Sequence, residues 1–218
     1  MAAPPAGQRL LARAALALLL AGCATQRVPA PSGGPPDPLR RAALQALSSY
    51  SLRAQLAASN GSEGFSAQLD WRQQGEAAHA RLRAPLGVGG AELDYVAGEL
   101  RYLGNDGRRL EGAAAEEALA RSLGFAPPLA SLRYWLLAVP DPSGEARERA
   151  DALGRPLQLA QSGWRVDYAD YADYQPAPVD AAGTGAGSGA ARQWLPGRIT
   201  LERAPLRLKL RILRWELP

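Results

Sequence analysis

The chain has 218 residues, a single cysteine and a formal net charge of +4 at pH 7. One cysteine excludes an internal disulfide, and the length is enough for one domain with a sizeable core. The basic residues, nearly all arginine, are spread singly along the chain, whereas a nucleic-acid-binding protein normally clusters them on one face. We therefore expect no nucleic-acid partner.

The N-terminal segment, residues 1–22, has the layout of a secretory signal peptide. Arg9 and Arg13 precede an apolar run that is far too short to cross a hydrocarbon layer, which takes roughly 20 residues. The segment leads into Leu20-Ala21-Gly22-Cys23, which resembles the lipobox of bacterial lipoproteins. Cys23 is therefore the predicted site of lipid attachment. The alternatives are an ordinary signal peptide that contains a cysteine, or a buried core cysteine.

The position after Cys23 carries information on the target membrane. Ala24 stands there, whereas an aspartate is the usual signal for retention in the inner membrane. The resemblance therefore implies a lipid-anchored protein of the outer membrane that faces the periplasm.

Composition divides the mature chain into a tether and one domain. Residues 23–38 are rich in Pro, Gly, Ser and Gln, with almost nothing to bury, and predict a flexible tether. A single domain is expected over residues 39–218. Residues 180–192 form a Gly/Ala/Ser-rich stretch within it that predicts a disordered loop insertion.

Hydrophobic periodicity predicts a mainly β domain with helices. Leu39, Ala43, Leu47 and Tyr50 recur at helical spacing and predict a first helix. Beyond residue 64 the period changes to two, with glycine turns between the runs, which is typical of an antiparallel meander with one buried face. The expected strands are 65–71, 78–84, 91–95, 99–103, 108–111, 157–161, 164–168, 199–202 and 206–212, and helices are expected over 113–123 and 129–139.

The last predicted strand changes its phase. Its apolar side chains face one way as far as Ile212. Leu213, Trp215 and Leu217 would point to the opposite face unless a β-bulge intervenes. About ten strands in one sheet would curl and close partly into an open antiparallel β-barrel, with the helices over its mouth or in its concave face.

The sequence contains no catalytic or metal-binding motif. His79 is the only histidine and lies on the polar side of its predicted strand. Asp167, Asp170 and Asp173 recur every three residues, which indicates a strand that runs out into an exposed loop, with a calcium site as the less favoured alternative. We expect neither an enzyme nor any metal or cofactor beyond the lipid on Cys23.

Two apolar features allow both a structural and a functional interpretation. Trp71 and Trp164 lie on the apolar faces of predicted strands; core packing explains such residues most simply, but a barrel lined by Trp and Leu also suits a flexible apolar ligand. Leu86 stands in a Pro- and Gly-bounded turn. It either tucks under the sheet or inserts into lipid.

Several segments, in their order and spacing, resemble the LolB family, outer-membrane lipoproteins that receive other lipoproteins from the periplasmic carrier LolA. They are the lipobox at Cys23, Leu69-Asp70-Trp71-Arg72-Gln73, Pro85-Leu86-Gly87, Ala115-Glu116-Glu117, residues 128–136, residues 163–168, Leu195-Pro196, Leu208-Lys209-Leu210 and Trp215.

The resemblance implies an open barrel with a hydrophobic cavity under a helical lid. By its Pro-Leu-Gly context, Leu86 matches a leucine that promotes membrane insertion of the cargo. The expected cavity residues that bind acyl chains are Trp71, Leu82, Leu93, Leu132, Trp135, Leu136, Trp164 and Trp215. The implied partners of this expected monomer are a LolA-type carrier, cargo lipoproteins and outer-membrane lipid. A different lipid- or hydrophobe-binding lipoprotein and an unrecognised periplasmic hydrolase remain the alternatives.

Overall fold

The computed structural model describes residues 33–61, 63–85, 89–123, 125–174 and 193–218. The predicted signal peptide, Cys23, Leu86 and the Gly/Ala-rich insertion lie outside these ranges. Within them, no helix is long and apolar enough to cross a membrane.

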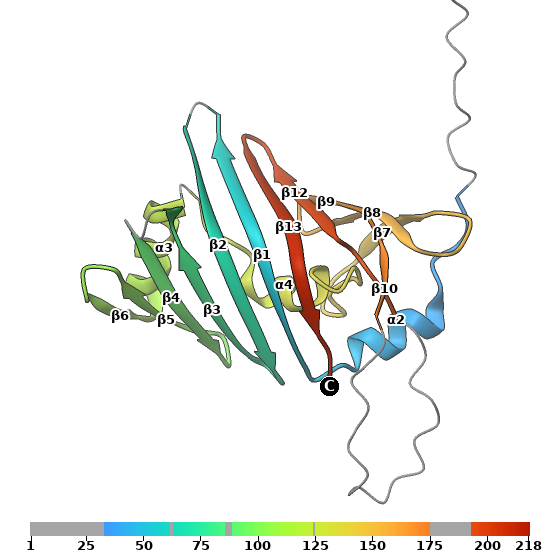
Figure 1. The fold of residues 1–218 in the computed structure, drawn as a ribbon, viewed down its shortest axis with the longest axis horizontal. Coiled ribbons are helices and arrows are strands. Elements are labelled where there is room, and N and C mark those ends of the chain that lie inside the picture. Colours follow the sequence, from blue (N-terminus) through green and yellow to red (C-terminus); the bar gives the residue numbers. More distant parts are fainter. Residues whose placement is uncertain (1–32, 62, 86–88, 124, 175–192) are drawn as a thin grey trace, which may run out of the picture. The chain divides into compact units, whose positions relative to one another are not determined.

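Eleven strands form one open sheet in the order β6-β5-β4-β3-β2-β1-β13-β12-β9-β8-β7, with every pairing antiparallel (Figure 1). The predicted mainly β class is confirmed. The strands are β1 (Ser49–Asn60), β2 (Glu63–Gln74), β3 (Ala77–Arg83), β4 (Gly90–Val96), β5 (Glu99–Gly104), β6 (Arg109–Glu111), β7 (Ala146–Ala150), β8 (Pro156–Gln161), β9 (Trp164–Ala169), β12 (Arg198–Arg203) and β13 (Leu206–Glu216). Two short strands, β10 (Ala172–Tyr174) and β11 (Gln193–Leu195), pair separately.

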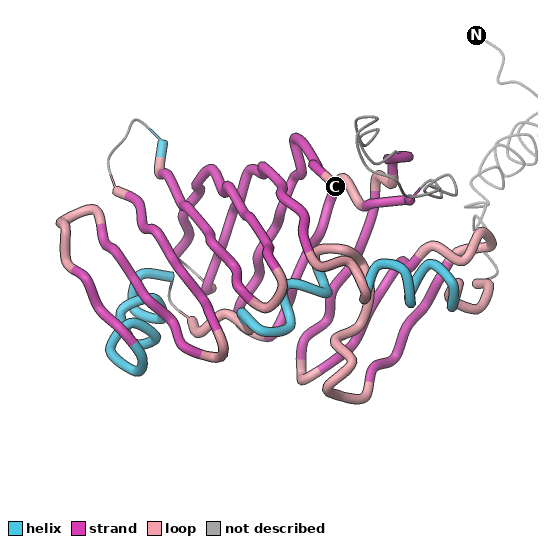
Figure 2. The backbone as a smooth tube through the Cα atoms, turned by 90° about the horizontal axis from the view of Figure 1, so that it is seen from below, coloured by secondary structure: helices cyan, strands magenta, loops and turns pink. Residues whose placement is uncertain are grey.

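Among the described residues, three helices accompany the sheet: α2 (Pro38–Gln45), α3 (Gly112–Leu123) and α4 (Leu129–Trp135). In Figure 2, α4 lies against the middle strands, with α3 toward one end of the sheet and α2 toward the other. The Asp37 carboxylate caps α2 by accepting the backbone N–H groups of Leu39 and Arg40 at 2.9 and 3.2 Å. Pro38 supplies the preset φ of a first helical residue.

The first predicted helix is too long, and the strand that follows it was not predicted. The helix ends at Gln45, and Tyr50 belongs to β1. The sequence of β1 is mostly Ser, Ala and Leu, with few residues that favour strands, and much of it favours helix. Pairing with β2 and β13 on both sides overrides that preference.

Helix α4 is also shorter than the predicted helix over residues 129–139. It ends at Trp135 rather than at residue 139, because Ala138 adopts a left-handed φ of 55°, which a continuing α-helix does not allow. Strands β7, β10 and β11 were not predicted either. Their three to five residues are too short to show a reliable period.

The β-bulge near the C-terminus is confirmed. Arg53 pairs with Arg214 and Ala54 pairs with Ile212, so Leu213 is the extra residue on β13. Leu213 is 46% exposed, whereas Trp215 is 5% exposed and turned back to the buried face. One additional residue thus returns the tryptophan to the core.

Backbone hydrogen bonds join the residues that precede α2 to the sheet. The backbone N–H of Gly34 donates to the carbonyl of Asp151 at 3.1 Å, and that of Asp37 donates to Gly154 at 3.4 Å. Residues 33–37 therefore lie against the turn between β7 and β8.

Candidate functional site

The inner face of the sheet, defined as the face whose side chains are buried, is apolar across its width. Across the sheet, each strand in the order β5-β4-β3-β2-β1-β13-β12-β9-β8 contributes at least one nearly inaccessible apolar side chain. They include Leu100, Leu93, Ala80, Trp71, Leu52, Leu210, Leu201, Val166 and Leu159. Two glutamines, Gln73 and Gln161, are the buried polar side chains of the described strands.

Helix α4 lies on this inner face, behind β1 and β13 in Figure 1. Its last residue, Trp135, is fully buried. The Tyr50 hydroxyl on β1 donates to the carbonyl of Arg133 at 2.7 Å, and burial of that hydroxyl raises the pKa of Tyr50 above its ordinary range. Leu132 is half-buried and packs against the same core.

One side chain on the sheet holds the C-terminal end of α4. The Gln161 amide oxygen accepts the Trp135 indole N–H at 2.8 Å and the backbone N–H of Asp141 at 2.9 Å. Its amide nitrogen donates to the carbonyls of Asp141 and Gly144 at 2.7 and 2.9 Å. These four hydrogen bonds use both the oxygen and the nitrogen of the Gln161 amide. They replace the hydrogen bonds to water that the amide loses on burial.

Aromatic rings gather in two clusters on the inner face. In the first, which we name the Trp164 cluster, the Trp164 ring centroid lies 6.3 Å from those of both Trp135 and Phe125. In the second, the Trp215 cluster, the Trp215 centroid lies 6.0 Å from Tyr50 and 6.4 Å from Tyr174. Rings at these separations make favourable tilted or edge contacts.

The structure brings all eight predicted cavity residues into one hydrophobic core. Leu82 and Leu132 are half-buried members, and the other six are buried: Trp71, Leu93, Trp135, Leu136, Trp164 and Trp215. A separate hollow of about 1150 Å³ shares only Leu82 with this set. The eight side chains thus pack against one another and against α4.

Arg40 is a buried charge that sequence reasoning did not single out. Its guanidinium donates to the main-chain oxygens of Leu137, Ala138 and Trp194 at 3.2, 3.2 and 2.8 Å. Burial lowers the pKa of this guanidinium below its usual value. Arg40 does not belong to the predicted stripe of Leu39, Ala43, Leu47 and Tyr50, and no local signal in the sequence marks its distant partners.

The polar residues considered for chemistry are engaged in separate pairs. His79 Nδ1 lies 2.6 Å from Asp94 Oδ1. Asp170 pairs with Arg198 at 2.9 Å, and Asp167 accepts from Gln158 at 2.6 Å. Over the part of the chain that the structure describes, no three His, Cys, Asp or Glu side chains gather as metal ligands.

A backbone hydrogen bond joins two described residues of the connection from β3 to β4. The Ala84 backbone N–H donates to the Gly89 carbonyl at 3.1 Å, and Pro85 is exposed. Leu86 lies in this connection but outside the described residues.

Comparison with known proteins gives consistent matches over nearly the whole chain. The family model described as outer membrane lipoprotein LolB matches residues 48–215. The outer-membrane lipoprotein LolB of Azoarcus sp. (strain BH72) is 33% identical over 215 residues, which is 98% of each chain. That of Nitrosococcus oceani is 33% identical over 208 residues, 92% of this chain and 93% of the relative. Among solved structures, a LolA superfamily protein from Nitrosomonas europaea has a TM-score of 0.46 and 8% identity, over 79% of this chain and 87% of that one.

Proposed function

Because this chain belongs to the LolB family of outer-membrane lipoproteins, we propose that its inner face receives the acyl chains of other lipoproteins. Family membership makes the chain an outer-membrane lipoprotein that takes part in lipoprotein transport and is not an enzyme. The proposed anchor is a lipid on Cys23, and no other cofactor is required.

The continuous apolar inner face supports this proposal most strongly. The free energy of an acyl chain falls by about 0.8 kcal/mol for each methylene group that is removed from water. Apolar contacts are non-directional, so they can shield chains of varied length and still release them. The eight residues named above, from Trp71 to Trp215, are the proposed contacts, since they already form one apolar surface.

Access to this face requires α4 to move. Trp135 and Leu136 at its C-terminal end are fully buried, whereas Leu82 and Leu132 are half-buried. We place the entry of the first acyl chain at these two leucines, because displacing neighbours there exposes least new apolar surface. In this proposal α4 acts as the lid, and the open sheet acts as the barrel wall.

The proposed transfer begins at a LolA-type carrier and ends in the outer membrane. Acceptance requires a surface that competes with the carrier for acyl chains, and release requires a route into the bilayer. We assign the release step to Leu86 in the loop between β3 and β4, with outer-membrane lipid as its target. The protein acts as a monomer in this scheme, with one cargo lipoprotein at a time.

A transfer assay tests the proposal. The full mature chain with Cys23→Ala is mixed with a LolA-type carrier that holds a labelled lipoprotein, and movement of the label is followed. Leu132→Glu and Leu82→Glu each place a charge on the half-buried part of the inner face and are expected to slow transfer at least about tenfold. Leu153→Glu is the matched control, because Leu153 is 70% exposed.

The assay distinguishes the proposal from a general effect of charge. Circular dichroism and urea unfolding establish that each variant is folded before its transfer rate is compared. Equal transfer by all three folded variants and the unaltered chain would show that the inner face does not receive the cargo.

A further inference from the structure

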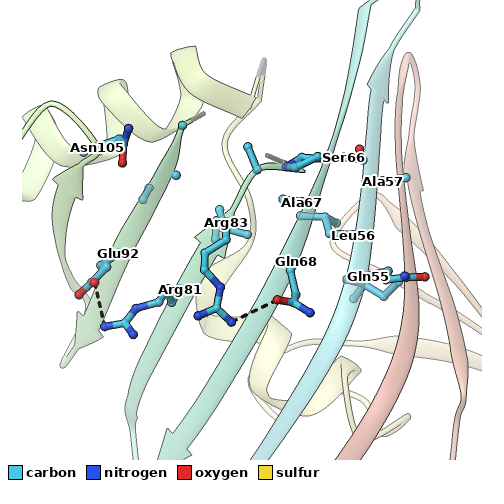
Figure 3. Close-up of a pocket in the computed structure, with 18 of the residues that line it drawn as sticks. Gln55, Leu56, Ala57, Ser66, Ala67, Gln68, Arg81, Arg83, Glu92 and Asn105 are labelled. Atoms are coloured by element: carbon cyan, nitrogen blue, oxygen red, sulfur yellow. Dashed lines mark hydrogen bonds and ion pairs between the residues drawn. The ribbon is translucent and has the colours of Figure 1, made fainter. Parts of the chain in front are cut away.

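The exposed face of the sheet carries a hollow of about 1150 Å³ over β1 to β5, β12 and β13 (Figure 3). Two of its lining residues, Ala57 on β1 and Ser66 on β2, pair directly across the strands. Both have short side chains, so the space above them stays open between longer neighbours. This hollow is on the polar face, away from the aromatic clusters of the inner face.

Long polar side chains border this hollow in a continuous row. The strand register places Arg83, Gln68, Gln55, Arg211 and Arg198 side by side across five neighbouring strands. Arginines that stand singly in the sequence are therefore brought together by the fold. Arg198 and Arg211 lie directly opposite each other, and like charges at such positions destabilise a sheet.

Carboxylates satisfy only part of this positive charge. Arg81 pairs with Glu92 at 2.8 Å, Arg198 pairs with Asp170 at 2.9 Å, and Arg83 pairs with Asp70. Lys209 and Arg211 also line the hollow, and neither has an ion-pair partner within the described part of the chain. Glu92 is the one acidic residue among the described residues that line the hollow, and its carboxylate already forms an ion pair with Arg81.

We propose that this hollow binds a phosphate-bearing anion through Lys209 and Arg211. A guanidinium offers two parallel donors to phosphate oxygens, and an ammonium adds a mobile point charge. Gln55 and Ser66 supply neutral hydrogen-bonding groups beside them. The phosphate can belong to a glycerophospholipid headgroup or to a soluble phosphate ester. The anion-binding groups stand on the polar face of the sheet, although Leu82 lines this hollow and also belongs to the proposed acyl-chain surface. The inference goes beyond the proposed function.

Two titrations of the full mature chain with Cys23→Ala test the site. One uses sn-glycerol 3-phosphate in calorimetry; the other uses phosphatidylcholine vesicles with and without phosphatidylglycerol, at fixed low ionic strength because salt screens such contacts. The double variant Lys209→Gln/Arg211→Gln is expected to bind about tenfold more weakly than the unaltered chain.

The matched control is Arg147→Gln/Arg149→Gln, which removes two alternating exposed charges from β7, outside the hollow. If only Lys209→Gln/Arg211→Gln binds both glycerol phosphate and anionic vesicles more weakly, the site takes lipid headgroups. If only this variant binds more weakly, and only to glycerol phosphate, the site takes soluble phosphates. Equal weakening in both double variants, or no phosphate-dependent binding by the unaltered chain, would overturn the proposal. Leu132 does not line the hollow, so the Leu132→Glu arm of the transfer assay tests the transfer proposal independently of this site.

Discussion

The Arg40 guanidinium lies 2.8 Å from the main-chain oxygen of Trp194 and 3.2 Å from that of Leu137. One side chain of α2 thereby joins β11 to the segment that follows α4. The Gln45 amide of the same helix donates to Pro140 at 2.8 Å. Helix α2 therefore holds the segment that directly follows α4, the element that we propose as the lid.

Arg40→Ala is expected to lower the free energy of unfolding by about 2–4 kcal/mol, because three main-chain carbonyls, two of them in buried hydrogen bonds, lose a charged donor. Urea denaturation followed by tryptophan fluorescence measures the change. Arg121→Ala is the control; its side chain is 69% exposed in a helical pair with Glu117, and such pairs contribute less than about 0.5 kcal/mol. Similar losses in the two variants would contradict the assigned role of Arg40.

The carboxylate of Glu148 gives the fold a pH dependence. Burial raises the pKa of Glu148, and its ion pair with Arg41 opposes that rise only in part. A group whose pKa is raised on folding stabilises the protein while it is protonated, and this contribution is lost as the pH rises. The stability of the unaltered chain relative to Glu148→Gln should therefore fall as the pH rises above about 4.3, the usual glutamate value.

Urea titrations of both chains at a series of pH values between acid and neutral measure this difference. A difference in unfolding free energy that stays constant, or that increases with pH, would show that desolvation does not dominate at Glu148.

Most of the sheet could be predicted from the sequence because its signal is local. The alternation in β2, β3 and β13 shows directly which side chains face the core, and the phase shift at Leu213 marks the bulge. The strand β1 could not be predicted in the same way. Its Ala- and Leu-rich sequence favours helix, and only pairing with two neighbours makes it a strand.

The candidate site was predictable to a similar extent. Trp71 and Trp164 follow from the period of their own segments, whereas Trp215 reaches the inner face only through the bulge at Leu213. The buried contacts of Arg40 join residues separated by 97 to 154 positions, and the row of Arg83 to Arg198 depends on strand order. No periodicity within one segment contains that information.

The bulged residue provides a test of how the core is aligned. Deleting Leu213 removes the extra residue between Ile212 and Trp215, and so turns Trp215 toward solvent. We expect a loss of about 3–5 kcal/mol, as for removal of a buried tryptophan. Leu213→Ser should change stability by less than about 0.5 kcal/mol, because the leucine is 46% exposed.

Thermal or urea unfolding of both Leu213 variants decides the point. If the deletion is as stable as the serine variant, β13 does not require the bulge to bury Trp215.

Leu86→Glu separates the two steps of the proposed transfer. The substitution adds a charge to the loop between β3 and β4 and replaces none of the eight proposed acyl-chain contacts. Acceptance of labelled lipoprotein from the carrier should continue, while delivery to vesicles should fall at least about tenfold, because a charged tip is unfavourable in lipid. Leu86→Met should deliver normally. Normal delivery by the glutamate variant would remove Leu86 from the insertion step.

The most direct measurement of the central claim is site-specific cross-linking to the cargo. A photoreactive amino acid replaces Leu132 in one full-length chain and Leu153 in another, and each receives a lipoprotein with labelled acyl chains from the carrier. The account predicts cross-links to the acyl chains at position 132 and almost none at position 153. Equal labelling at the two positions, or labelling at 153 alone, would contradict the claim that the inner face shields the acyl chains.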